Sequence, residues 1–361
     1  MPAGIEWPAA APLLWQLANY GGLLMRFALF DQVEHTGQPL HKVYADRLRL
    51  LQVADEAGFW CYFKSEHHFT PLDVAPSLGA WLAAVAARTS KMRIGPLVYL
   101  LPFHHPIQLL EEIAMLDHLS EGRLELGVGR GISPPEHEMW GLEKELARER
   151  SEETLKILLA GMTSDSLTFE GRFWNFHEVP IQIRPLQKPY PPLWYPGNLD
   201  VAGQRGFHTV TAGSATDVAR AVKQFAGINK EHAGAAGRVN PGSTPKLGAV
   251  QRVFLSGNAD TALERGRVAW KHFDHNITLL WRRAGITELP LNPTADGDFD
   301  KAAAWGLAFA GTPAMLREHL EGYRDVDPMI LCFEWGDLDA SEVRRSMELF
   351  IEQVMPGMQD H

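Results

Sequence analysis

Short apolar runs alternate along the chain with longer stretches in which apolar residues recur at helical spacing. The first pair shows the pattern. RFALFD at 26–31 is typical of a buried strand, and residues 40–58 form a helical stretch that ends at a glycine. Strand–helix pairs repeated in this order are the signature of βαβ units and of a parallel sheet.

The remaining pairs extend the series to about eight units. The second strand, FWCYF, is continuously apolar, as a strand buried on both faces should be. Such a series closes more naturally as a (β/α)8 TIM barrel than as an open sheet, although the pattern alone leaves the open sheet possible. The other predicted strands lie at 59–63, 93–100, 123–129, 191–197, 207–213, 246–256 and 328–334, and the other helices at 76–89, 107–119, 148–161 and 339–354.

Two stretches interrupt the series, and one precedes it. Residues 162–192 hold turn residues and short β-like pieces, so we interpret them as an excursion after strand four. Residues 274–300 are less regular, and we expect a long loop before strand eight that acts as a lid or a binding loop. Residues 1–24 have neither a basic leader region nor a run able to span a bilayer. We therefore expect an N-terminal extension followed by one domain over 25–361.

Composition excludes several classes of partner. Hydrophobic residues make up 45% and charged residues 22%, which fits a globular cytoplasmic protein that does not act at a membrane. A net charge of −10 argues against a nucleic-acid partner. Cys61 and Cys332 each lie in an apolar run, so we expect buried, unpaired thiols. No Cys and His spacing indicates a metal site.

Paired histidines follow two of the predicted strands. Barrel enzymes carry their sites on the loops at the carboxyl ends of the strands. His67 and His68 follow strand two, and His104 and His105 follow strand three. A histidine there can act as an acid or base, or it can serve only as a structural hydrogen-bonding group. The residues leave both roles open for His67 and favour the structural role for the other three.

Glycines flank Arg130 in the segment GVGRGIS after strand four. Glycines let a backbone approach an anion closely, and the arginine offers two parallel hydrogen bonds to phosphate. The same glycines could simply make a tight strand end, so both readings stay open. The segment lacks the third glycine of a dinucleotide-binding fingerprint.

The charged run EKELARERSEE at 143–153 is interpreted as an exposed helix face.

Taken together, several segments resemble the bacterial luciferase-like flavin monooxygenases. They are MRFALFD, AGF with EHHFT, LPFHHPIQLLEEIAMLDHLSEGRLELGVGRG, GTP at 311–313 and SMELFIEQVMP, so the likeness spans Met25 to Pro356 and is nearer to the alkanal monooxygenases. The resemblance implies a homodimer that receives reduced FMN from a separate flavin reductase. Dioxygen would form a flavin hydroperoxide, which oxygenates a small organic substrate such as an aldehyde, ketone or terpene.

The resemblance also implies roles for single residues. His67 falls on the catalytic histidine of the family, and Arg130 on the arginine that contacts the FMN phosphate. A non-prolyl cis peptide that faces the flavin ring would fall between Leu97 and Val98. The predicted cofactor-binding residues are Arg130, Leu97, Val98, Gly129, Ser133, Gly197 and Asn198.

At two places the sequence departs from the family pattern. Gly129 stands where luciferase has a cysteine, which argues against light emission, and the loop after strand five is shorter. One alternative is a deazaflavin-dependent enzyme of the same superfamily that transfers hydride. Another is a non-catalytic flavin-binding partner subunit, against which the presence of both His67 and Arg130 argues. An unrelated barrel hydrolase is a weaker alternative.

Overall fold

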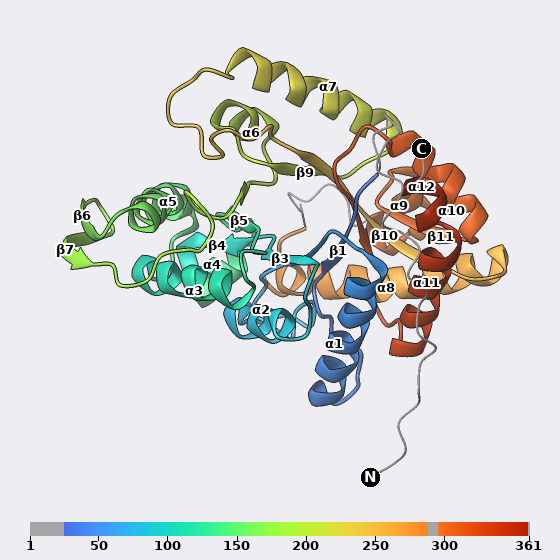
Figure 1. Ribbon diagram of the computed structural model, residues 1–361. Helices are drawn as coiled ribbons and strands as arrows, with labels where there is room; N and C mark the ends of the chain where they lie inside the picture. Colours follow the sequence, from blue (N-terminus) through green and yellow to red (C-terminus); the bar gives the residue numbers. More distant parts are fainter. Residues whose placement is uncertain (1–24, 288–294, 360–361) are drawn as a thin grey trace, which may run out of the picture.

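The computed structural model describes residues 25–287 and 295–359, so the predicted extension at 1–24 and part of the predicted loop lie outside the described residues. Parallel strands lie at the centre and helices surround them (Figure 1). The central strands are β1 (Phe27–Asp31), β2 (Cys61–Lys64), β3 (Arg93–Pro96), β4 (Tyr99–Leu100), β5 (Leu126–Gly129), β8 (Leu193–Trp194), β9 (Thr209–Thr211), β10 (Leu247–Leu255), β11 (Ala308–Gly311) and β12 (Met329–Cys332).

The strand pairings follow one another around a ring. β12 pairs with β1, β1 with β2 and β2 with β3, while β4, β5 and β8 pair in turn. Single parallel bridges, Ile94 to Leu124 and Trp194 to His208, join these groups to each other and to β9. β9 pairs with β10, and β10 with β12, which returns the ring to its start. This curled parallel sheet with its outer helices is consistent with the predicted TIM barrel.

Helices connect the strands, and many begin at a residue whose side chain accepts a backbone hydrogen bond, as Asp339 does in a capping box with Glu342. The helices are α1 (Leu40–Ala57), α2 (Leu78–Ala86), α3 (Pro106–Leu119), α4 (Pro134–Met139), α5 (Ala147–Thr163), α6 (Leu199–Arg205), α7 (Ala215–Glu231), α8 (Ala259–Arg283), α9 (Phe299–Ala304), α10 (Pro313–Leu320), α11 (Ala340–Gln353) and α12 (Met355–Gln359), with short 3-10 turns at Leu101–Phe103, Lys144–Leu146, Ala295–Gly297 and Glu321–Tyr323.

Three features differ from or refine the predicted elements. The expected lid at 274–300 was wrong in its first part, because α8 stays helical to Arg283. β11 was not predicted, and it extends the sheet along the carboxyl half of β10. Between α5 and β8 lies an antiparallel hairpin, β6 (Ser166–Glu170) and β7 (Asn175–Pro180), which projects away from the central strands (Figure 1).

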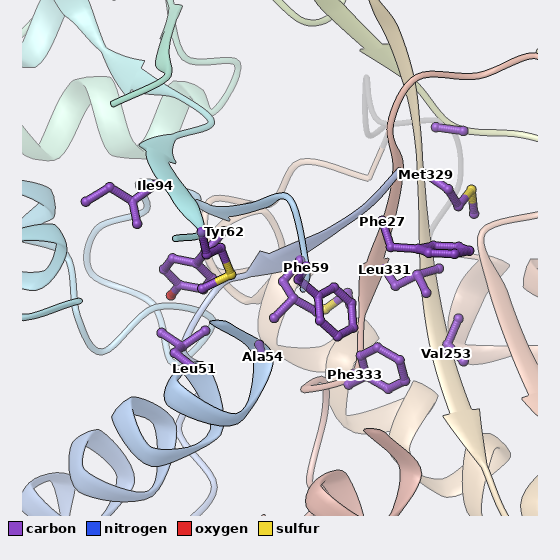
Figure 2. Close-up of a cluster of buried hydrophobic side chains, with 14 of the residues drawn as sticks. Phe27, Leu51, Ala54, Phe59, Tyr62, Ile94, Val253, Met329, Leu331 and Phe333 are labelled. Atoms are coloured by element: carbon purple, nitrogen blue, oxygen red, sulfur yellow. The ribbon is translucent and has the colours of Figure 1, made fainter. Parts of the chain in front are cut away.

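Alternate residues of each strand pack into different apolar layers. Phe27, Tyr62 and Leu331 belong to the larger core, which lies between the strands and the helices and includes Leu51 and Ala54 of α1 (Figure 2). The intervening strand residues form a second, smaller cluster inside the ring. Its buried members are Ala28, Cys61, Phe63, Leu97, Trp194 and Ile330. Both cysteines are buried and unpaired, which confirms that prediction.

Aromatic and cationic side chains fill the interior of the barrel from the middle of its strands to their amino ends. The ring of Phe63 lies 5.3 Å from that of Trp194, and Trp60, which precedes β2, lies 6.2 Å from Trp194. Arg26 and Lys246 sit over the Trp60 ring at 4.9 Å and 4.7 Å. The axis of the barrel is therefore packed at this end.

Candidate active site

A cavity of about 410 Å³ opens at the carboxyl ends of the strands, where barrel enzymes carry their sites. Its walls come from the ends of β1 and β4, from the segments that follow β2, β3, β5 and β8, and from helices α4, α5 and α6. Among the lining residues are seven of the eight predicted site residues, namely His67, Leu97, Val98, Gly129, Arg130, Gly197 and Asn198. A larger hollow, of about 1010 Å³, lies between α7 and the segment before β10 and includes none of them.

Ser133 is the predicted residue that lies outside this cavity. It is the N-cap of α4, where its Oγ accepts a 3.4 Å hydrogen bond from the backbone N–H of Glu136. It lines a small adjoining pocket of about 30 Å³ instead. His67 and Glu136 line both spaces, and the other walls of the small pocket are largely apolar side chains of α8, Ile277, Leu280 and Trp281.

Hydrogen bonds from the backbone to two carboxylates hold His67 and His68 in place. The N–H of His67 donates to Oδ2 of Asp73 at 3.1 Å, and that oxygen also accepts from Nζ of the buried Lys64 at 2.6 Å. The N–H of His68 donates to Oε1 of Glu136 at 2.8 Å. The loop that presents His67 is thus fixed from two sides, while the His67 ring remains partly exposed to the cavity.

Glu66 organises the histidines that sequence reasoning left as structural. Its carboxylate accepts from Nε2–H of His68 at 2.9 Å, from Nε2–H of His104 at 2.9 Å and from the backbone N–H of Leu100 at 2.7 Å. Burial alone would raise the pKa of Glu66, but the hydrogen bonds from His104 and His68 outweigh it and lower the value. Burial alone would lower the pKa of His104, but the hydrogen bond and the charge of Glu66 together outweigh it and raise the value. These contacts support structural roles for His68 and His104.

The peptide bond between Leu97 and Val98 is cis, as predicted, and both residues line the cavity. It separates β3 from β4, so the single predicted strand at 93–100 is divided there. Gly129 packs against this wall. A Cβ added at Gly129 would lie 2.6 Å from Cγ2 of Val98, so a larger residue would have to push the wall aside. The luciferase-type cysteine does not fit this backbone without such a shift.

Two arginines face the cavity, and sequence reasoning found only one. Arg130 follows β5, and Arg148 lies near the start of α5 within the run interpreted as an exposed helix face. That interpretation missed Arg148 and Glu152, since both line the cavity. Glu152 is paired with Arg205 of α6 at 2.8 Å. Within the described parts of the chain, neither Arg130 nor Arg148 has an ion-pair partner.

Arg130 adds positive charge close to Lys144. Burial, followed by the positive charge of Arg130, lowers the pKa of Lys144. Asn198 is the N-cap of α6 and accepts from the backbone N–H of Val201 at 2.9 Å, and Gly197 before it has a φ of 97° that favours glycine. The uncompensated cations and these loop residues make this end of the cavity suited to an anionic group.

A sequence profile of the luciferase-like monooxygenases matches residues 25–327. The chain belongs to this family. The match confirms the resemblance that the EHH and GVGRG segments indicated. The description of the family and the named monooxygenases among the relatives support an oxidoreductase.

Relatives of the luciferase-like chain include named monooxygenases. The uncharacterized protein y4wF of Sinorhizobium fredii is 33% identical over 300 residues, which cover 82% of this chain and 85% of y4wF. The oxygenase component of the flavin-dependent trigonelline monooxygenase of Acinetobacter baylyi is 32% identical over 190 residues, half of either chain (50% and 52%). Limonene 1,2-monooxygenase of Rhodococcus erythropolis is 25% identical over 321 residues, covering 86% and 80%.

Solved structures share the luciferase-like fold. Monooxygenase RslO1 of Streptomyces bottropensis superposes with a TM-score of 0.76 at 25% identity, covering 92% of this chain and 99% of that one. The FMN complex of the 3,6-diketocamphane monooxygenase component of Pseudomonas putida gives 0.75 at 20% identity, covering 92% and 98%. The coenzyme F420-dependent tetrahydromethanopterin reductase of Methanopyrus kandleri gives 0.66 at 17%, covering 94% and 100%. The fold is therefore shared by flavin-dependent and F420-dependent enzymes.

The described residues also lack two features, a membrane-spanning helix and a cluster of metal ligands. They contain no helix that is long and apolar enough to cross a bilayer. They also contain no group of three or more His, Cys, Asp or Glu side chains placed to hold a metal ion.

Proposed function

We propose that this protein is a flavin-dependent monooxygenase that uses reduced FMN and dioxygen to oxygenate a small organic substrate. The observation that carries the proposal is that one cavity joins His67, the apolar pair Leu97 and Val98, and two arginines that have no ion-pair partner among the described residues. The flavin-dependent relatives support it.

The residues present fit FMN. Arg130 and Arg148 would hold the phosphate, with Gly197 and Asn198 beside them. The apolar wall of Leu97 and Val98 would bound the ring system. Reduced FMN, when bound, supplies the electrons that activate dioxygen.

The chain itself supplies orientation, a water-poor surface and a proton carrier. Glu66 fixes the backbone of Leu100 and so the wall that follows the cis peptide. Leu97 and Val98 present apolar surface to the cavity, which disfavours water there. His67, held by its backbone to Asp73, places an imidazole that can accept or donate a proton at a ring nitrogen.

The small pocket beside His67, of about 30 Å³, has room for only a small part of the substrate, the rest of which would lie in the larger cavity. Ile277, Leu280 and Trp281 of α8 line the small pocket, together with Leu72 and Ile132. Such walls suit an uncharged, largely apolar molecule, such as an aldehyde, ketone or terpene. The proposal also includes two protein partners: a separate flavin reductase, and a second copy of the chain. Exposed Met115 and Leu119 on α3 support the homodimer, which light scattering in solution checks.

The second candidate function is hydride transfer with a deazaflavin. The fold shared with F420-dependent enzymes favours it, and a phosphate-bearing deazaflavin could use the same arginines. The two candidates differ in cofactor and in whether oxygen enters the product.

Anaerobic calorimetric titration with reduced FMN, and separately with reduced F420, tests the proposal. We expect FMN to bind, and R130A or R148A to weaken its binding by about 10- to 100-fold each, because each loses a charge-assisted hydrogen bond. R220A, on the outer helix α7, is the control and should leave the affinity unchanged, since Arg220 is exposed and paired with Asp217. Binding of reduced F420 alone would favour hydride transfer, and binding of neither cofactor would overturn both candidates.

A further inference from the structure

His67 and Glu136 form the wall between the two spaces of the site. Both side chains line the larger cavity and the small apolar pocket. Glu136 belongs to α4, and its side chain is only 6% exposed. A carboxylate with so little access to water needs partners that compensate its charge.

One oxygen of Glu136 faces both histidines of the loop. Oε1 accepts the backbone N–H of His68 at 2.8 Å, and Nδ1 of His67 lies 3.8 Å from the same oxygen. Burial alone would raise the pKa of Glu136, but the neighbouring His67 and the backbone N–H of His68 outweigh it and lower the value. The carboxylate is therefore ionised near neutral pH.

We propose that Glu136 is a positioning residue that accepts a hydrogen bond from Nδ1–H of His67 and so keeps the lone pair of the imidazole on Nε2. A carboxylate that accepts from one imidazole nitrogen fixes the tautomer of the ring. The backbone of His67 is already held by Asp73, so we expect the 3.8 Å gap to close by movement of the side chains. Hydrogen bonds at catalytic groups are commonly long without ligands and shorten when the site is filled.

The other carboxylates close to His67 already have partners. Asp73 is paired with Lys64 at 2.6 Å, and Glu66 is hydrogen-bonded to His68 and His104. Arg130 lines the same cavity. For Glu136, His67 is the one ion-pair partner in the described portion of the chain. The geometry thus assigns the Nδ1 contact of His67 to Glu136.

Nitrogen-15 NMR of the histidine rings, recorded without any cofactor near neutral to mildly alkaline pH, tests the assignment. The signals of His67 are identified by their loss in H67Q. In the unmodified protein we expect the proton on Nδ1. In E136Q the ratio of the Nδ1–H to the Nε2–H form should fall by about tenfold, because the glutamine still accepts the His68 N–H but carries no charge.

The matched control is E138Q. Glu138 is on the same helix but is exposed, and its substitution should leave the His67 ratio unchanged. If E136Q does not fold, E136D serves instead, and its shorter carboxylate should also lower the ratio. A His67 proton on Nε2 in the unmodified protein, or an unchanged ratio in the Glu136 variants, would overturn the assignment. The assignment draws its chemical meaning from the proposed function, but this readout needs no flavin, so the two can fail separately.

Discussion

The buried carboxyl group of Glu34 makes the stability of the folded chain depend on pH. Glu34 follows β1, and its oxygens accept from Nδ2 of Asn276 in α8 at 2.8 Å and from the backbone N–H of Gly336 after β12 at 3.0 Å. Burial raises its pKa to about 7 from 4.5, although the hydrogen bonds from Asn276 and Gly336 act in the opposite direction. Between these two values the folded state binds more protons than the unfolded state, so stability falls as pH rises.

The variant E34Q should therefore lose the pH dependence that Glu34 causes. Relative to E34Q, the unmodified protein should lose roughly 2 to 3 kcal/mol of unfolding free energy between about pH 5 and about pH 8. The glutamine can keep both contacts if the amide of Asn276 turns over. Urea unfolding at the two pH values measures the difference, and an equal difference at both would show that Glu34 titrates normally.

At the scale of elements, β3 and the segment before β5 can approach each other closely because Gly95 has no side chain. A Cβ added at Gly95 would lie 2.0 Å from the backbone oxygen of Glu125, which cannot move away without opening the ring. We expect G95A to lower the free energy of unfolding by about 3 kcal/mol. The matched change G227A, in α7 where nothing lies within 4 Å, should instead raise it by about 0.5 to 1 kcal/mol.

Denaturant unfolding of both glycine variants measures these changes. A G95A protein as stable as the unmodified one would mean that β3 and β5 separate easily. This pair of strands carries the cis peptide Leu97–Val98 and Arg130, so the same substitution should also reduce the affinity for reduced FMN.

At the scale of the molecule, a buried arginine ties the first and last strands to α1. Arg47 is paired with Glu334, after β12, and its Nε lies 3.4 Å from Oδ2 of Asp31 at the end of β1. R47M would leave two largely buried carboxylates without their cation, so we expect a loss of about 3 to 5 kcal/mol. R49M is the control. Arg49 lies on the same helix, is 69% exposed and pairs with Asp46, so its loss should cost about 1 kcal/mol or less.

Thermal and denaturant unfolding of the two arginine variants provide the comparison. If R47M and R49M lost the same amount of stability, the ion pairs of Arg47 would contribute nothing beyond the backbone pairing of β1 with β12 and their apolar packing. Phe27, which packs edge-on against Phe350 at 4.9 Å, is part of that packing.

The sequence predicts the site residues that directly follow a strand, and it does not reveal those whose place depends on tertiary contacts. His67 and Arg130 directly follow predicted strands, so their meeting in one cavity follows from the parallel sheet. Arg148 lies in a polar run that looks like any exposed helix face. Residues 274–283 looked irregular because α8 buries polar side chains there, Asp274, Asn276 and Thr278, which interrupt the apolar pattern of a helix.

The packed amino end of the barrel has an evolutionary consequence. Trp60, which carries Arg26 and Lys246 over its ring, lies at the amino ends of the strands, and the Phe63–Trp194 pair packs against it inside the barrel. Substitutions in the loops around His67 should therefore reshape the cavity without disturbing the packing at the amino ends of the strands. Proteins with this arrangement can acquire new substrates while the packing at the amino ends of their strands stays almost unaltered.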